Sequence, residues 1–325
     1  MKVGILGAGK IAAWMGRTLA GLEGACAYGV ASRDLQRAKA FGERYGVEKI
    51  YGSYEEMLED KEVDLVYIAT PHSHHFEHMK LCIEYGKNIL CEKAFTANGE
   101  QAKEIFALAE AKGIFVTEAM WIRYMPSCRI IREAVESGII GEVTSLTANL
   151  GYELRNIPRL QEPALAGGAL LDLGVYTINF ARMVFGEDIR EVTSACTKLE
   201  TGVDSQHMIT LTYGDGRMAV LNATMLAQTD RRGIINGTKG YIQVENINNP
   251  EKILVYNLER RLVKSYEIPA QITGYEYEVM AAQKAIWDGK TECSEMPHQE
   301  TIHIMEMMDE LRRRWGIVYP FEGKN

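Results

Sequence analysis

The stretch Gly7-Ala8-Gly9-Lys10-Ile11-Ala12 decides the fold of this 325-residue chain. It follows a short apolar run, Val3–Leu6, and opens a segment, Lys10–Leu22, whose apolar residues recur at helical spacing. In a G-x-G-x-x-A turn of this kind, Gly7 permits the tight turn, Gly9 lets the backbone approach a pyrophosphate, and Ala12 allows close helix–strand packing. The helix N-terminus, beginning with Lys10 and Ile11, then faces the anion. The motif therefore predicts a bound dinucleotide rather than a tight turn alone.

Outward from this motif, strands and helices alternate over the first 120 residues. Further strands are expected at Ala25–Ala31, Leu65–Thr70, Asn88–Cys91 and Ile114–Thr117. Helices are expected at Leu35–Tyr45, Ser73–Tyr85 and Gly99–Lys112. The run Leu65–Thr70 is continuously apolar, which is typical of a parallel strand covered on both faces. The alternation predicts an α/β, doubly wound parallel sheet that forms a dinucleotide-binding domain over residues 1–121.

The pattern changes after Glu118, and residues 122–325 predict a second α/β domain that binds substrate. Its strands are expected at Val143–Tyr152, Val192–Leu199, Gln206–Tyr213, Arg217–Leu226, Tyr241–Glu245, Ile253–Leu258 and Leu262–Ile268. Its helices are expected at Ser127–Ser137, Gly167–Phe185, Tyr275–Trp287 and Gln299–Arg314. Consecutive strands with short turns indicate a large, open and mostly antiparallel sheet. Helices on one side of such a sheet leave an apolar face, so we expect a homodimer or a dimer of dimers through it.

The composition excludes several classes of protein. Hydrophobic residues make up 46% and charged residues 25% of the chain, which are values of a globular protein. The net charge of −8 argues against nucleic-acid or anionic-membrane partners. We expect no membrane span, because no apolar run approaches about 18 residues. The six cysteines include no CxxC pair, which indicates neither a zinc site nor a redox motif and fits the reducing cytoplasm.

The end of the second strand indicates which dinucleotide binds. An NAD site usually places an acidic residue there to accept hydrogen bonds from the ribose 2′-hydroxyl. This chain has Ser32 and Arg33 instead, and Asp34 comes later, where it can cap the next helix. Ser32 can bond a 2′-phosphate, and Arg33 can bind it and stack on adenine, unless Arg33 is simply a solvated surface residue. The sequence therefore favours NADP(H) over NAD(H).

Two strand ends of the first domain carry polar residues at the edge where open α/β sheets bind ligands. After the third strand comes Thr70-Pro71-His72-Ser73-His74-His75, and after the fourth Cys91-Glu92-Lys93-Ala94. A lysine at a buried sheet edge is costly without a task, so Lys93 is expected to hold a substrate hydroxyl or to lower a neighbour's pKa. Ser73 is expected to cap its helix, and His72 or His75 either lines the nicotinamide ribose or is structural. Without a firm third ligand, the histidines predict no metal site. We expect cofactor contacts from Thr70, Pro71, His72, His75 and Glu92.

The second domain contributes the stretch GGALLDLGVY at residues 167–176. Asp172 and Tyr176 are four residues apart and so lie on one face of a helix that is otherwise apolar. As structural residues, they would satisfy each other or the backbone. As functional residues, Tyr176 would pass a proton to or from an alcohol oxygen while hydride moves to or from carbon, and Lys93 would depress its pKa.

Together these stretches resemble the Gfo/Idh/MocA oxidoreductase family over essentially the whole chain: GAGKIA, ATPHSHH, CEKA and GGALLDLGVY. The stretch EAMWIRYMP at residues 118–126 is similar to the branch that contains dimeric dihydrodiol dehydrogenases and NADP-dependent sugar dehydrogenases. The resemblance implies a Rossmann domain followed by an α/β domain whose open sheet forms a dimer face. It also implies that Lys93, Asp172 and Tyr176 line the active site.

Two positions depart from the family pattern. Ala94 replaces the usual proline after the lysine, which loosens the turn but leaves the amine. Tyr176 stands where many members have histidine, which favours the dihydrodiol and aldose branch over inositol dehydrogenases. Candidates for the substrate rim, each with packing or surface exposure as its alternative role, are Trp121, Arg123, Tyr152, Arg155 and Arg159.

The sequence thus predicts an enzyme that transfers hydride reversibly between NADP(H) and a secondary alcohol or carbonyl of a sugar, cyclic polyol or vicinal diol. Tyr176 would be the general acid/base, Lys93 its electrostatic partner and the group that holds the substrate, and Asp172 the residue that orients it. Two alternatives remain open on the residues alone. One is a redox-neutral, glycoside-cleaving enzyme that retains its cofactor. The other is a non-enzymatic NADP sensor, which would not need a proton donor.

Overall fold

The structure is a computed structural model that describes residues 1–322, and it divides into two compact units. The first unit comprises Met1–Tyr124 with Gln271–Glu306, and the second comprises Met125–Ala270 with the residues from Met307 onward. Residues 271–306, expected in the second domain, thus cluster with the first. The reason is tertiary: within that unit the Tyr275 ring stacks on Trp121 and His298 Nε2 lies 2.8 Å from the Val116 carbonyl oxygen.

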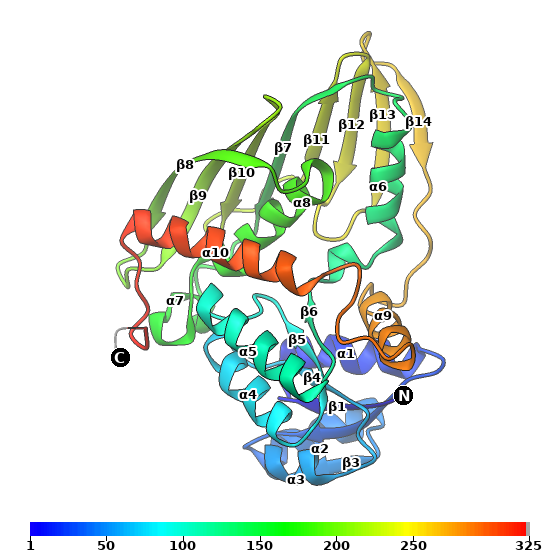
Figure 1. Ribbon diagram of the computed structural model, residues 1–325, viewed down its shortest axis with the longest axis vertical. Helices are drawn as coiled ribbons and strands as arrows, with labels where there is room; N and C mark the ends of the chain where they lie inside the picture. Colours follow the sequence, from blue (N-terminus) through cyan, green and yellow to red (C-terminus); the bar gives the residue numbers. More distant parts are fainter. Residues whose placement is uncertain (323–325) are drawn as a thin grey trace. The chain divides into compact units, whose positions relative to one another are not determined.

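The first unit contains a six-stranded parallel sheet in the order β3-β2-β1-β4-β5-β6 (Figure 1). Its strands are β1 (Lys2–Leu6), β2 (Cys26–Ala31), β3 (Lys49–Tyr51), β4 (Leu65–Ile68), β5 (Asn88–Glu92) and β6 (Val116–Ala119). Its helices are α1 (Lys10–Gly21), α2 (Leu35–Tyr45), α3 (Tyr54–Glu59), α4 (His72–Glu84), α5 (Gly99–Lys112), the 3-10 turn η1 (Trp121–Arg123) and α9 (Glu276–Trp287). The helix α10 (His298–Trp315) contributes residues to both units.

This strand order confirms the predicted doubly wound sheet. The order reverses between β1 and β4, and ligands of such sheets bind at the carboxyl ends of the strands beside that point. Every residue of β4 is fully buried, as predicted for a parallel strand covered on both faces. The strand β3 and the helix α3 were not predicted, because three and six residues are too few to show a periodic pattern.

The second unit is built on an eight-stranded sheet in the order β14-β13-β12-β11-β7-β10-β9-β8. Its strands are β7 (Val143–Gly151), β8 (Ile189–Lys198), β9 (Asp204–Tyr213), β10 (Met218–Thr224), β11 (Gly233–Gly237), β12 (Gly240–Glu245), β13 (Lys252–Asn257) and β14 (Leu262–Tyr266). Its helices are α6 (Pro126–Glu136), α7 (Pro158–Gln161), η2 (Pro163–Leu165), the π-helix η3 (Leu170–Gly174) and α8 (Val175–Phe185). Only β7 and β10 pair in parallel among the described strands of this sheet, so the mostly antiparallel prediction is confirmed.

The two faces of the eight-stranded sheet differ. The helix α8 packs on β7 and β10, and Figure 1 shows it across one face of the sheet. Residues that alternate with the buried ones point to the other face, where three apolar side chains are exposed: Met208 (62%), Met218 (44%) and Val220 (45%). These apolar side chains share the face with polar ones such as Thr210, Thr212 and Asn222, so the face expected to be apolar is mixed.

One helical stretch, Pro163–Phe185, is long and apolar enough to cross a membrane by length and composition alone. In the described part of the chain, 89% of its most apolar window is buried inside the structure. This burial is that of a core helix, as its apolar character on all sides predicted.

Candidate active site

The turn after β1 has the geometry that a dinucleotide phosphate needs. Gly7 has a φ of +104°, and a Cβ there would lie 3.1 Å from the Ala69 carbonyl oxygen, so only glycine fits without strain. Gly9 is the N-cap of α1, no side chain caps the helix, and a Cβ at Gly9 would meet nothing within 4 Å. Ala12 is fully buried, whereas Lys10 is exposed and Ile11 is half-buried. The uncapped N–H groups of α1 therefore face open space at Gly9, and this cradle fits a pyrophosphate.

The end of β2 carries no acidic group for a ribose hydroxyl. Asp34 Oδ1 accepts hydrogen bonds from the backbone N–H groups of Gln36 (3.0 Å) and Arg37 (3.2 Å), which confirms its predicted role as the cap of α2. Ser32 is buried, and its hydroxyl oxygen accepts from the Asp34 N–H at 3.2 Å, which leaves the hydroxyl proton to donate. Arg33 is exposed and forms no ion pair with any residue that the structure describes. The strand end thus offers a hydroxyl and a guanidinium that can both donate to a phosphate.

The end of β4 differs from the prediction at Ser73. The N-cap of α4 is Pro71, whose extended backbone lets the helix begin at His72, so the prediction that Ser73 caps the helix was wrong. The Ser73 hydroxyl instead forms a hydrogen bond with His74 Nδ1 at 2.9 Å. His72 is buried in the first turn.

The His75 ring lies within hydrogen-bond distance of the backbone that follows β4 and of the backbone that follows β5. It is fully buried, with Nδ1 2.9 Å from the Ala94 carbonyl oxygen and Nε2 2.8 Å from the Thr70 carbonyl oxygen. Both ring nitrogens therefore lie within hydrogen-bond distance of protein carbonyl oxygens, as in the structural role that the sequence left open. The expected contact of His75 with the cofactor stays a prediction.

The loop after β5 carries Lys93 directly after a buried carboxylate, Glu92. Glu92 is buried, accepts a short hydrogen bond from the Tyr67 hydroxyl, and accepts from the Lys93 backbone N–H at 3.2 Å. These internal partners fix the Glu92 carboxylate, and its expected contact with the cofactor stays a prediction. The Lys93 side chain is half-buried at this sheet edge, and the Lys93–Ala94 peptide bond is cis.

Glu118, at the end of β6, is a site residue that the sequence reasoning missed. Its buried carboxylate accepts hydrogen bonds from the Phe95 N–H at 3.2 Å and the Thr301 hydroxyl at 3.0 Å. Burial raises the pKa of Glu118 to about 7, while its two hydrogen bonds and the charges of Arg123 and Lys93 act in the opposite direction. The signal was the stretch at residues 118–126, which contains this carboxylate.

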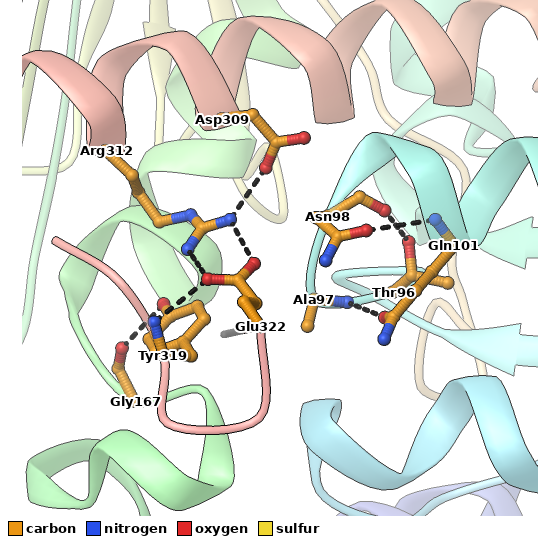
Figure 2. A network of polar contacts seen from close by, with 9 residues as sticks. All are labelled: Thr96, Ala97, Asn98, Gln101, Gly167, Asp309, Arg312, Tyr319 and Glu322. Atoms are coloured by element: carbon orange, nitrogen blue, oxygen red, sulfur yellow. Dashed lines mark hydrogen bonds and ion pairs between the residues drawn. The ribbon is translucent and has the colours of Figure 1, made fainter. Parts of the chain in front are cut away.

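The segment between Lys93 and α5 is fixed by its own polar groups, as the right half of Figure 2 shows. The Thr96 hydroxyl donates to the Asn98 carbonyl oxygen at 2.7 Å, and the Ala97 N–H donates to Gln101 Oε1 at 3.1 Å. Asn98 caps α5 by accepting from the Gln101 N–H at 2.9 Å. Together with Glu118, these bonds hold the backbone around Lys93 in one conformation.

The two rim candidates of the first unit are packed residues. The Trp121 indole is buried and stacks on the Tyr275 ring, with 4.5 Å between centroids. The Arg123 side chain is 9% exposed and forms a short ion pair with Glu300. Both side chains are thus packed within the first unit, and their place at the substrate rim stays a prediction.

In the second unit, two glycines allow the chain to approach its neighbours before the Asp172 helix. A Cβ at Gly167 would lie 2.6 Å from the Leu160 carbonyl oxygen, and one at Gly168, where φ is +117°, would lie 2.3 Å from Asp204 Oδ1. The Tyr319 hydroxyl donates to the Gly167 carbonyl oxygen at 3.0 Å (Figure 2, left).

The same figure shows how the segment that carries Tyr319 is held. Arg312 donates to both carboxylate oxygens of Glu322, each at 2.8 Å, and to Asp309 at 2.8 Å. Through Tyr319, this partly buried network helps to fix the backbone shortly before the helix of Asp172.

Asp172 and Tyr176 lie where a π-helix passes into an α-helix. The prediction of a uniform α-helix is corrected here, because Leu170–Gly174 forms the π-helix η3 and α8 begins at Val175. Such wider turns are frequent at functional sites. The exposed fractions of Asp172 and Tyr176 are 5% and 6%. Asp172 Oδ1 accepts a hydrogen bond from Arg159 Nη2 at 3.0 Å, which brings one rim candidate to the predicted site.

The other two rim candidates of this unit, Tyr152 and Arg155, form no hydrogen bond with Asp172 within the described part of the chain; their partners lie elsewhere. The Tyr152 hydroxyl donates to Asn248 Oδ1 at 3.1 Å and accepts from Arg231 at 3.2 Å. Arg155 is exposed, with its Nε 3.9 Å from the nearer carboxylate oxygen of Glu153.

Comparisons with known proteins match both units. Residues 1–120 match the family described as "Oxidoreductase family, NAD-binding Rossmann fold", and residues 128–243 match the "GFO/IDH/MocA C-terminal domain". Among curated relatives, the trans-1,2-dihydrobenzene-1,2-diol dehydrogenase of Xenopus tropicalis is 36% identical over 301 residues, which cover 90% of each chain. The enzyme of that name from Homo sapiens is 32% identical over 297 residues, 90% of this chain and 89% of the relative.

Solved structures with the same fold include a ketoreductase and a dehydrogenase. The 3-ketoreductase KijD10 from Actinomadura kijaniata, in complex with NADP and TDP-benzene, superposes with a TM-score of 0.86 at 26% identity, covering 96% of this chain and 97% of that one. A levoglucosan dehydrogenase in complex with NADH and levoglucosan has a TM-score of 0.85 at 21% identity, covering 97% of each chain, and shares the fold. The family predicted from the motifs is confirmed: the chain belongs to the GFO/IDH/MocA family of oxidoreductases.

Proposed function

We propose that the protein catalyses reversible hydride transfer between NADP(H) and a secondary alcohol or carbonyl of a vicinal diol, sugar or cyclic polyol. The observation that carries the proposal is the half-buried Lys93 on a fixed loop at the carboxyl edge of the cofactor-binding sheet. Relatives over nine-tenths of the chain are named dehydrogenases of a dihydrodiol, which supports this substrate class over glycoside cleavage and over a sensor without activity.

The nicotinamide, when bound, supplies the hydride acceptor or donor. We assign the proton to Tyr176, which takes it from the substrate hydroxyl during oxidation and returns it during reduction. Lys93 acts on the same substrate oxygen by donating a hydrogen bond, and its charge lowers the pKa of the phenol. Asp172, oriented by Arg159, accepts a hydrogen bond from the substrate and fixes its position.

The cofactor preference follows from the β2 end. Ser32 keeps a proton to donate, Arg33 has no carboxylate partner among residues 1–322, and Asp34 is engaged in capping α2. These three facts together favour a 2′-phosphate over a free 2′-hydroxyl. The solved relative KijD10, with NADP bound, supports the same choice.

A substrate panel tests the function. We expect NADP+ reduction, read as absorbance of the reduced nicotinamide, with at least one trans-diol or pyranose, and a lower rate with NAD+. Carbonyl compounds should be reduced with NADPH, because the reaction is reversible. Sugar release from glycosides without a net change in the oxidation state of the nicotinamide would contradict the proposal. The absence of turnover with all diols, sugars and polyols would also contradict it.

We further propose that the protein is a homodimer, or a dimer of dimers, through the exposed face of the eight-stranded sheet. Val220 lies in that face beside Met218 and Met208, and burying such side chains favours association. We expect sedimentation to show a dimer or tetramer for the native chain and for Val318→Glu, an exposed position off the sheet. Val220→Glu should dissociate it. A native monomer at micromolar concentration would refute this interface.

We assign the protein to the cytoplasm. The six cysteines include no pair at CxxC spacing, which fits a compartment that keeps thiols reduced.

A further inference from the structure

Four side chains, those of Arg33, Tyr54, His74 and His78, gather beside the end of β2, all within the first unit. The Tyr54 and His78 rings meet edge to face with 4.9 Å between centroids, and the rings of His78 and His74 are 5.7 Å apart. The guanidinium of Arg33 interacts with the Tyr54 hydroxyl. Tyr54 comes from α3 and the two histidines from α4, so this cluster joins the ends of β2 and β4, on either side of β1.

His74 is the member of the cluster that has a ring nitrogen available to bind a ligand. Its Nδ1 is bonded to the Ser73 hydroxyl at 2.9 Å, and its Nε2 has no hydrogen-bond partner among residues 1–322. The ring is half-buried in the first turn of α4, whose N-terminus has no side-chain cap. His78, one turn further, is instead bonded through Nδ1 to the Thr70 hydroxyl at 3.0 Å.

The surroundings of His74 oppose a proton on the ring in the absence of an anion. Burial lowers the pKa of His74, and the charge of Arg33 lowers it further. Titratable groups from three segments face this cluster. They are His75 and His78 from the same helix, Arg33 after β2, and Tyr54 with its neighbour Glu55 from α3. Glu55 is exposed, so the cluster itself contains no buried carboxylate. A dianion placed between Arg33 and His74 would raise the pKa of His74, because its negative charge attracts the proton that the charge of Arg33 repels.

We propose that His74 is a specificity-determining residue for the 2′-phosphate of NADP(H), which it binds together with Arg33 by taking up a proton from solvent. This inference rests on the proposed preference for NADP(H). It is supported by the unpartnered Nε2, by the position at a helix N-terminus, and by the convergence of the β2 and β4 ends where the adenosine half of a dinucleotide lies. Arg33 supplies a permanent charge and His74 a conditional one.

The proposal makes the affinity for NADP(H) depend on pH in a stated direction. The pKa of His74 is below its ordinary value in the free protein. The negative charge of a bound phosphate should raise it. Between these two pKa values binding takes up a proton, so affinity increases as pH falls. The useful range is about pH 8 to 6.5, because the second pKa of a phosphate monoester is about 6. NAD+ lacks the phosphate and should bind equally across that range.

Isothermal titration of the full-length protein tests this with NADP+, NAD+ and 2′,5′-ADP as ligands. For the native chain we expect the Kd of NADP+ and of 2′,5′-ADP to fall by about three- to tenfold from pH 8 to 6.5. The upper figure corresponds to a rise of about one unit in the pKa of His74 on binding. Repeating the titration in buffers of different ionisation enthalpy should reveal net proton uptake. In His74→Gln the pH dependence and the proton uptake should both disappear, while the Kd of NAD+ stays as in the native chain and reports intact folding. His78→Gln, one turn away, should retain the native pH dependence.

Two results would overturn the inference and are distinguishable. If His74→Gln keeps the native pH dependence, or if His78→Gln loses it instead, His74 does not bind the phosphate although NADP(H) remains the cofactor. If the native chain binds NAD+ more tightly than NADP+ at every pH and does not bind 2′,5′-ADP, the proposed cofactor preference fails as well.

Discussion

Tyr176→Phe should lower kcat by about 10²- to 10⁴-fold, the range typical of removing a general acid or base. The substitution deletes one oxygen from a nearly buried ring, so packing in the helix is retained. The Kd of NADP+ should not change, because the proposed role concerns the substrate proton alone. Steady-state rates with the best diol or sugar, together with a cofactor titration, measure both quantities.

The matched control is Tyr241→Phe, which removes a phenol oxygen from β12 of the same unit. Its turnover should equal that of the native enzyme. Unchanged turnover in Tyr176→Phe would remove the proposed mechanism. A loss of cofactor binding in that variant would show instead that the ring supports the fold of the site.

Lys93→Met should lower kcat/KM by about 10²- to 10³-fold, since it removes both a hydrogen bond to the substrate oxygen and a charge near the phenol. Methionine has similar length and suits a half-buried position. The pH profile gives an independent readout. A positive charge lowers the pKa of a tyrosine, whose ordinary value is about 10, so its removal should move the rise of the oxidation rate toward higher pH.

Lys103→Met serves as the control, because it removes an exposed lysine that pairs with Glu306 at the surface of the same unit. Its kinetics should remain native. In the double variant of Lys93 and Tyr176, the loss should be smaller than the product of the two single losses, since the two groups are proposed to act on one oxygen. Fully multiplicative losses, with no change in the pH profile of Lys93→Met, would contradict the proposed coupling.

The parallel sheet was predictable because its signals are local. The glycine turn, the apolar run Leu65–Thr70 and well-capped helices lie in short windows of sequence, and the expected helices Leu35–Tyr45 and Gly99–Lys112 have the same bounds in the structure. Asp34 could be assigned as a cap because capping involves residues two and three positions along the chain.

Features that depend on competition between neighbouring groups were predicted less well. Pro71 takes the cap position that Ser73 was expected to hold, and the π-helix at Asp172 is invisible in a pattern that suits an α-helix equally well. The strand β3 has too few residues for a periodic signal, and β11 consists of Gly-Ile-Ile-Asn-Gly, whose glycines and asparagine are typical of turns rather than strands.

The sequence by itself determined the family, the order of strands and helices, and which residue types stand at the strand ends. Only the tertiary structure decided which of those polar groups are free and which are occupied. His75 faces two carbonyl groups, Arg123 is paired with Glu300, and Glu118 is bonded to Thr301. The physical reason is that a buried polar group must find a partner, and these partners come from segments as much as 183 residues away along the chain, which no local pattern specifies.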